Sequence, residues 1–143
     1  AAGGYYFSTF AGNPVSAAVG MAVLDVMERD RLPQQADRVG AYLRSQLEKL
    51  AESTDCIAEV RGPGMFIGVE IVRSDGTADP GRAHSIQNAM RERCVLIGRT
   101  GVDGNVLKIR PPLAFGESDA DALADAADGE VARLRVGEVE AVD

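Results

Sequence analysis

The segment from Val15 to Met27 constrains this chain more than any other, because its side chains are apolar on nearly every face of a helix. Asn13 is a strong N-cap residue, and Pro14 fits the first helical position, where no backbone N–H is needed. A helix that is apolar all round is buried on most of its faces. Because the chain has only 143 residues to bury it, we expect a further domain or subunit to cover this helix, and self-association where none does.

Composition indicates a folded domain and excludes several classes of partner. Apolar residues make up 45% of the chain and charged residues 26%, which suits both a core and a soluble surface. The net charge of −7 argues against nucleic-acid binding, because phosphate contacts need clustered Lys and Arg. No apolar run reaches the roughly 20 residues of a membrane helix, and the first residues do not resemble a signal peptide. We therefore expect no nucleic-acid partner and no membrane association.

Cysteine and histidine usage argues against a metal centre. Cys56 and Cys94 lack the spacing of metal ligands, and two thiols without a secretion signal indicate a reduced, cytoplasmic protein. The only histidine, His84, excludes most arrangements in which histidines bind a metal or activate a nucleophile. We expect His84 to be a surface residue on a helix, and we expect no metal ion.

Hydrophobic periodicity predicts an α/β domain, of the α+β type, in which helices pack on one side of a small and mainly antiparallel sheet. We expect Asp30 and Pro33 to mark the end of the first helix. Further helices are predicted at residues 35–52 and 82–93, and from a cap at Ser118 to about residue 134. Strands are predicted at residues 57–61, 65–72, 95–97 and 105–110. Residues 135–143 are expected to form a loose tail.

Three segments carry a resemblance to a known family. They are Ser8-Thr9-Phe10-Ala11-Gly12-Asn13-Pro14, Val60-Arg61-Gly62-Pro63-Gly64-Met65-Phe66-Ile67-Gly68-Val69-Glu70, and Asn105-Val106-Leu107-Lys108-Ile109-Arg110-Pro111-Pro112-Leu113. In this order and at this spacing they resemble the class III aminotransferases, which are fold-type-I pyridoxal-phosphate (PLP) enzymes, from about Tyr5 to Leu134. Within this family, the residues of the three segments are most similar to the alanine–glyoxylate aminotransferase 2-like branch, which also includes phospholyases acting on phosphorylated amines.

The resemblance implies a division of the chain and a cofactor. Residues 1–14 would end the large PLP-binding domain, and residues 15–134 would form a linker helix and the C-terminal small domain. In the family, the threonine that matches Thr9 binds the phosphate of the PLP held by the other subunit, which implies a homodimer. Ser8 lies beside it. From the residues alone, hydroxyl groups before a helix N-terminus suit a phosphate, and an ordinary capping turn is the alternative.

Substrate binding is expected on the strand predicted at residues 105–110, where Lys108 and Arg110 share one face. In ornithine- and GABA-type relatives, an arginine three residues before a double proline grips the substrate carboxylate with two hydrogen bonds. Lys108 occupies that position here, so the usual contact is in doubt. Arg110, and Arg99 in the glycine-rich loop at residues 98–104, are the other candidates. An ordinary solvated strand face is the alternative for Lys108 and Arg110.

The second segment is interpreted mainly as structural. Gly62, Gly64 and Gly68 permit a tight turn and a close approach of backbones. Glu70, at the end of the segment, is given no role.

The lysines decide what the chain is expected to do by itself. A PLP enzyme needs a lysine that binds the cofactor covalently and later moves a proton. In the family this lysine lies upstream, in the large domain. Lys49 is predicted on the wet face of a helix and Lys108 in the substrate segment, so neither matches it. The chain is therefore interpreted as the C-terminal part of an enzyme, without a catalytic residue of its own and inactive alone.

Three functions are compatible with these features. The leading one is a PLP-dependent aminotransferase that moves an amino group between an amine or amino acid and a 2-oxo acid. The second is a PLP-dependent phospholyase acting on a phosphorylated amine, which the replacement of arginine by Lys108 favours. The third is a stand-alone binding or regulatory module that reuses the fold, because a fold does not determine a function.

Overall fold

The computed structural model of this chain describes residues 8–9 and 11–135. Two compact units, residues 1–34 and residues 35–143, are described each by itself. The first contains helix α1 (Pro14–Arg29). The second contains most of helix α2 (Leu32–Glu52), helices α3 (Pro80–Glu92) and α4 (Glu117–Arg135), and a four-stranded sheet. The predicted tail lies, apart from Arg135, outside the described residues.

Helix α1 begins where the sequence predicts. The Asn13 side-chain oxygen accepts hydrogen bonds from the backbone N–H groups of Val15 and Ser16, at 2.9 and 3.3 Å, and Pro14 is the first helical residue. None of the helix's residues is buried within the described part of the chain, and Val15 and Leu24 are 71% and 57% exposed. What covers this apolar helix stays a prediction.

Helix α2 begins three residues earlier than predicted, at Leu32. Pro33 therefore lies in its first turn, where a missing N–H breaks no helical hydrogen bond. Helix α1 ends at Arg29 with Asp30 as its C-cap, as predicted, whereas Pro33 belongs to the start of α2 and not to the end of α1. Arg31, between the two helices, has a φ of 50°. The predicted apolar stripe of α2 is confirmed, since Leu43 and Leu47 are at most 2% exposed.

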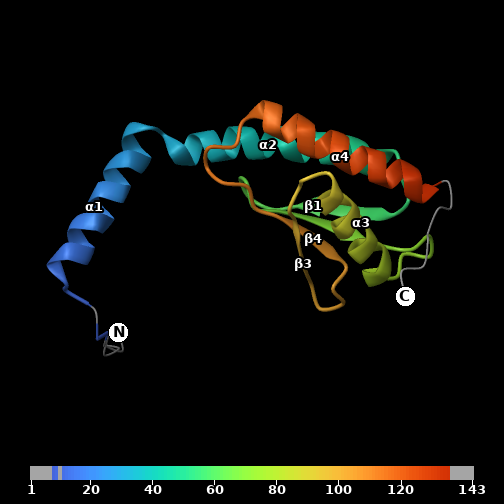
Figure 1. Ribbon diagram of the computed structural model, residues 1–143, viewed down its shortest axis with the longest axis horizontal. Helices are drawn as coiled ribbons and strands as arrows, with labels where there is room; N and C mark the ends of the chain where they lie inside the picture. The colour runs from blue at the N-terminus through green and yellow to red at the C-terminus, as the bar shows by residue number, and fades with distance from the viewer. Residues whose placement is uncertain (1–7, 10, 136–143) are drawn as a thin grey trace, which may run out of the picture. The chain divides into compact units, whose positions relative to one another are not determined.

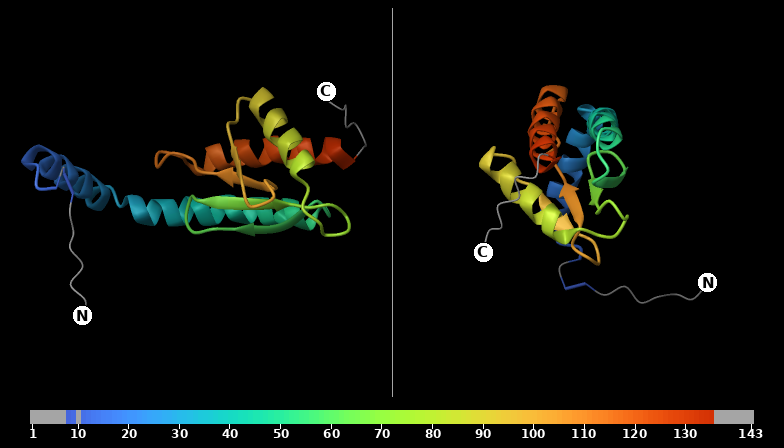
Figure 2. Two further views of the ribbon diagram at one scale, coloured as in Figure 1. Left: turned by 90° about the horizontal axis from the view of Figure 1, so that it is seen from below. Right: turned by 90° about the vertical axis from the view of Figure 1, so that its right-hand side faces the viewer.

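The sheet is antiparallel throughout and runs in the order β1-β2-β4-β3. Its strands are β1 (Ile57–Arg61), β2 (Ile67–Ile71), β3 (Gly98–Thr100) and β4 (Val106–Ile109). The register of the edge strand β1 shifts between Ile57 and Glu59, as it does at a bulge. Figures 1 and 2 show α2, α3 and α4 on one side of the sheet, as predicted.

One hydrophobic core joins the three helices to one face of the sheet. Leu43 of α2, Ile71 of β2 and Met90 of α3 are at most 1% exposed within it. Because successive side chains of a strand point to opposite faces, residues that alternate with core positions point away from the helices. We call this side the open face, and it carries Glu59, Arg61, Gly68, Glu70, Gly98, Thr100, Val106 and Lys108.

The strand predicted at residues 95–97 was misplaced, because pairing begins only at Gly98. The Val95 N–H donates to the Met90 carbonyl oxygen at 2.9 Å, which keeps this residue on the end of α3. Gly98 is the first residue that lies opposite β4, where its partner is Lys108. Val95 and Ile97 therefore pack against the core, and the strand is formed by the residues that follow them, Gly98–Thr100.

Helices α3 and α4 also begin slightly earlier than predicted, because aspartates provide the capping contacts. The Asp79 carboxylate accepts a hydrogen bond from the Arg82 N–H at 2.9 Å, so α3 starts at the residue after Asp79. The Gly116 N–H donates to the Asp119 carboxylate at 2.8 Å, and Ser118 lies inside the first turn of α4. Ser118 is therefore not the cap that the sequence suggested.

A close approach of two glycines joins α2 to the turn between β1 and β2. A Cβ atom built on Gly40 would lie 2.0 Å from the Gly64 carbonyl oxygen, far inside contact distance. Gly64 itself has a φ of 49°, and a Cβ on Gly62 would lie 1.9 Å from the Phe66 carbonyl oxygen. The structural interpretation of Gly62 and Gly64 is confirmed, and Gly40 is a third member that the sequence analysis missed.

This packing inverts the usual effect of alanine in a helix. Gly→Ala normally stabilises a helix interior by about 1 kcal/mol. We expect Gly40→Ala instead to lower the free energy of unfolding by about 2 kcal/mol, because the methyl group overlaps backbone that cannot move away easily. Urea unfolding measures the change.

Gly81→Ala is the matched control, because its Cβ would meet nothing closer than the Asp79 carboxylate at 3.6 Å. Its free energy of unfolding is expected to stay unchanged or to rise. Equal stability of the two variants would contradict tight contact between α2 and the turn.

Candidate functional site

The open face of the sheet carries a row of residues with two glycines in it. Arg61 lies opposite Gly68, Gly68 opposite Lys108, and Lys108 opposite Gly98. Directly opposed residues of an antiparallel pair share a face, so Arg61 and Lys108 are two strands apart with only a glycine between them. A Cβ on Gly98 would lie 3.0 Å from Lys108 Cε, which shows that the lysine side chain extends over Gly98.

Arg110 follows β4 and alternates with Ile109 to the same side as Lys108. Its Cζ lies 5.9 Å from the centroid of the Phe66 ring, within range of a cation–π contact. Neither Lys108 nor Arg110 forms an ion pair with any residue that the structure describes. Two uncompensated cations two residues apart, on a chain of net charge −7, form a place for an anionic group.

Arg99 lies on the opposite face of the sheet. It pairs with Leu107, which belongs to the core, and its side chain turns toward α3. Arg99 Nε donates to Gln87 Oε1 at 2.9 Å, and Nη1 donates to the Pro80 and Gly104 carbonyl oxygens at 3.3 and 3.4 Å. The structure therefore brings Lys108 and Arg110 together on one face and holds Arg99 elsewhere, so Arg99 would have to release these contacts to reach a ligand there.

Ser8 and Thr9, the residues expected to contact a phosphate, belong to the first unit. Both are exposed, and their hydroxyl groups have no partner among the described residues. The first-turn N–H groups of α1 are less available than the sequence suggested, because Asn13 already accepts those of Val15 and Ser16. A phosphate at this position would therefore depend on the two hydroxyl groups rather than on a free helix N-terminus.

Arg61 joins two glutamates that face each other across β1 and β2. Glu59 and Glu70 are directly opposite partners, an arrangement that is repulsive by itself. Arg61 Nη1 donates to Glu70 Oε2 at 2.5 Å and to Glu59 Oε2 at 2.7 Å. The hydrogen bond that Arg61 donates to Glu70, with a smaller contribution from the one to Glu59, raises the pKa of Arg61 above its usual value. Glu70 has no role that the sequence alone indicates, and only the pairing of the two strands identifies it as part of this trio.

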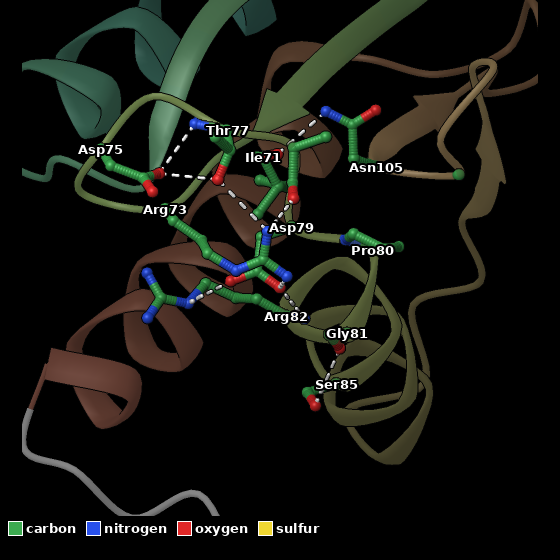
Figure 3. A network of polar contacts seen from close by, with 12 residues as sticks. Ile71, Arg73, Asp75, Thr77, Asp79, Pro80, Gly81, Arg82, Ser85 and Asn105 are labelled. Carbon is green, nitrogen blue, oxygen red and sulfur yellow. Dashed lines mark hydrogen bonds and ion pairs between the residues drawn. The ribbon is translucent and has the colours of Figure 1, made fainter.

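A second polar cluster lies at the start of α3, at the end of the sheet away from Arg110 (Figure 3). Arg73 and Arg82 flank the Asp79 carboxylate at 3.9 and 3.7 Å. A polar hollow of about 720 Å³ adjoins them. Because Asp79 caps α3 and both arginines accompany that cap, the cluster is explained by the anchoring of the helix.

His84 lies on the surface of a helix, as the sequence predicts. His84 is an exposed residue of α3 whose ring lies 3.2 Å from the Asn88 amide nitrogen, so the surface assignment is confirmed. No group of three or more potential metal ligands occurs among residues 8–9 and 11–135. Within the same ranges, no helix has the length and apolarity needed to cross a membrane.

Comparison with known proteins settles the family. The chain matches the model of the class III aminotransferases over residues 2–128. It belongs to that family. Family membership implies PLP as the cofactor and confirms the resemblance on which the sequence analysis relied.

This aminotransferase-family chain has several similar relatives. It is 43% identical over 131 residues to alanine–glyoxylate aminotransferase 2 homologue 2, mitochondrial, of Arabidopsis thaliana, covering 90% of this chain and 28% of that protein. It is 40% identical over 124 residues to a Drosophila melanogaster protein named alanine–glyoxylate aminotransferase 2-like, covering 85% and 25%. A solved phospholyase from Arthrobacter, in complex with phosphoethanolamine, is 44% identical with a TM-score of 0.82, covering 89% and 31%. The chain thus spans between 25% and 31% of the length of these relatives.

The geometry predicts different consequences for two basic residues. We expect Arg99→Ala to lower the free energy of unfolding by about 1–2 kcal/mol, because it removes hydrogen bonds that tie β3 to α3. Lys108→Ala is the matched control, and its change is expected within about 0.5 kcal/mol, because the ammonium group has no described partner. Urea unfolding of both variants provides the test, and a stability-neutral Arg99→Ala would return Arg99 to the candidates for ligand contact.

Proposed function

We propose that this chain is the C-terminal part of a PLP-dependent aminotransferase, which moves an amino group between an amine or amino acid and a 2-oxo acid. The observation that carries the proposal is the pair of uncompensated cations on the open face, Lys108 and Arg110, in a chain of the class III family. Such a pair suits the carboxylate or other anionic group of a small substrate. The names of the Arabidopsis and Drosophila relatives support the same reaction class.

The cofactor would supply the electron sink that amino-group transfer needs. The residues present fit a contact with its phosphate, because the Ser8 and Thr9 hydroxyl groups are exposed and have no partner among the described residues. In the proposal, these hydroxyl groups donate hydrogen bonds to the phosphate of the cofactor in the partner subunit of a homodimer. The same homodimer, or a further domain, would cover the exposed apolar side chains of α1.

We also propose that the lysine that holds the cofactor is not in this chain. Lys49 is an exposed residue of α2, and Lys108 extends over Gly98 on the open face. Lys108 in this role could no longer bind the anionic group of a substrate, and Lys49 donates a hydrogen bond to Gln46 Oε1 at 3.3 Å on the exposed surface of α2. The chain alone is therefore expected to be inactive. The cytoplasmic location stays a prediction, beside an Arabidopsis relative whose name gives a mitochondrial one.

A PLP-dependent phospholyase acting on a phosphorylated amine is the second candidate, and Lys108 is the observation that favours it. Lysine is a point charge that suits a phosphate, whereas the bidentate grip on a carboxylate needs arginine. Lys108 and Arg110 together offer two positive charges to a dianionic phosphate. The similarity to the Arthrobacter phospholyase supports this candidate. The third candidate, a stand-alone binding module, is weakened by the family match over most of the chain.

The deciding experiment uses the full-length protein that contains this chain, loaded with PLP. We expect a visible absorption band from the bound cofactor that an amino acid bleaches and a 2-oxo acid restores, because the amino group moves onto the cofactor and off again. Release of inorganic phosphate from phosphoethanolamine, without any need for a 2-oxo acid, would instead establish the phospholyase. A protein that binds no PLP would contradict both.

The Thr9 contact predicts a defect in cofactor binding. We expect Thr9→Ala to weaken the affinity of the full-length protein for PLP by roughly 30-fold, because a hydrogen bond to a charged group contributes about 2 kcal/mol. Titration of cofactor-free protein with PLP measures the affinity. Thr9→Ser keeps the hydroxyl group and is expected to bind PLP nearly as tightly as the unaltered protein, and equal weakening in both variants would contradict a hydroxyl contact.

A further inference from the structure

Arg61 forms ion pairs with both carboxylates on the open face of the sheet. Its Nη1 atom lies 2.5 Å from Glu70 Oε2 and 2.7 Å from Glu59 Oε2, and the three side chains remain between 33% and 58% exposed. Glu59 and Glu70 are the only acidic residues in the part of the open face that the structure describes. One arginine therefore neutralises one of the two negative charges and holds both carboxylates on the β1 side of the sheet.

On the open face, Lys108 is the cation that lies diagonally beside Glu70. Glu70 lies opposite Val106, and Lys108 is two residues further along the same strand. Diagonal neighbours of this kind lie about 7–8 Å apart, which is within reach of long side chains. Gly68, the residue between Arg61 and Lys108 in the row, contributes no side chain of its own, and the apolar Val106 side chain reaches over it, with Cγ1 3.2 Å from where a Cβ of Gly68 would lie.

The structure nevertheless records no ion pair between Lys108 and a described residue. The simplest electrostatic reason is that the guanidinium of Arg61 is the better partner, because one nitrogen contacts both carboxylates at once. The net charge of the four ionised groups Glu59, Arg61, Glu70 and Lys108 is zero, but its distribution leaves the positive charge at Lys108, next to Arg110.

We propose that Arg61 is a positioning residue that keeps Glu59 and Glu70 away from Lys108, and thereby leaves Lys108 and Arg110 free to bind the anionic group of the substrate. The proposal rests on the proposed function, because it assumes that these two cations meet the substrate. It gives the Val60–Glu70 segment a role that its glycines do not explain: the segment sets the charge of the binding face as well as the shape of a turn.

The test is a charge cycle, which is a set of variants that remove the charge of Arg61, the charges of Glu59 and Glu70, or all three. The variants are made in the full-length, PLP-loaded protein and assayed with the anionic amine that it consumes as substrate. Arg61→Met is expected to raise the KM by roughly fivefold and to leave kcat within about twofold, because unpaired carboxylates about 8 Å away oppose the anion. Glu59→Gln with Glu70→Gln is expected to lower the KM by more than that factor, because it changes the local charge by +2 rather than by −1. The triple variant, which removes a net charge of −1, is expected to have a KM at or somewhat below that of the unaltered protein.

A second readout does not depend on activity. The rate at which an amine-reactive reagent labels Lys108, followed by mass spectrometry, reports how freely its ammonium group is exposed. Inorganic phosphate is the probe ligand. We expect phosphate to protect Lys108 from labelling in the unaltered protein and to protect it less in Arg61→Met. In the triple variant the protection is expected to return. The differences should shrink at high salt, because the charges are partly exposed and screened.

Arg38→Met is the matched control, because it removes an equal charge whose ion-pair partner, Glu117, is on α4. It is expected to change neither the KM nor the labelling of Lys108. An Arg61→Met variant with an unchanged KM, or a triple variant as impaired as Arg61→Met, would overturn the proposal. Should Arg61→Met fail to fold, the Glu59→Gln, Glu70→Gln protein keeps Arg61 and still tests the direction in which the KM changes.

The two levels of the proposal fail in distinguishable ways. A protein without PLP binding or turnover contradicts the proposed function, and the charge cycle then has no substrate to measure. A protein that is active, but in which all four variants share one KM and one rate of Lys108 labelling, contradicts the role of Arg61 alone.

Discussion

The fold and its candidate site both depend on the burial of one face of the sheet only. Three helices cover the face that carries Ile71 and Leu107, and these residues enter a single core with Leu43. Because strand side chains alternate, burying Leu107 and Ile109 forces Lys108 to the other side. The apolar positions of β4 thus place the charged ones. A shift of this strand by one residue would bury the lysine and expose the core, so the register is strongly specified.

Glycines make this arrangement possible at two distant points. Gly40 and Gly64 let the backbone of α2 approach the turn that leads from β1 into β2. That turn sets which residues of the two strands face each other, and so brings Arg61 opposite Gly68. Gly98 in turn gives the Lys108 side chain room on the β3 side. The charged groups of the open face therefore depend on backbone contacts made partly on the helical side of the domain.

Local features of the sequence were enough to predict most of the elements. Asn13 and Pro14 define the start of α1, and the stripe that contains Leu43 defines α2, because both signals are complete within a few residues. The position of β3 was not predictable in this way. Gly98 has little preference for a strand by itself and joins the sheet because Lys108 lies opposite it, which is a contact between residues ten apart in the sequence.

The candidate site was predicted in the same uneven manner. That Lys108 and Arg110 share a face follows from alternation along one strand, so the sequence was sufficient. That Arg99 points to the other side depends on its pairing with Leu107, and the link of Arg61 to Glu70 depends on the pairing of β1 with β2. Each of these needs the register between strands, which no single segment contains.

The two edges of the sheet have a consequence for how copies of this chain can associate. An exposed strand edge is a template for pairing with another chain, and proteins protect such edges with short strands, bulges and charges. Here β3 has only three residues, and β1 combines an irregular register with the charged side chains of Glu59 and Arg61. Fibril-like growth through the sheet is thus disfavoured at both ends, so any association of copies is expected through the exposed apolar side chains of α1.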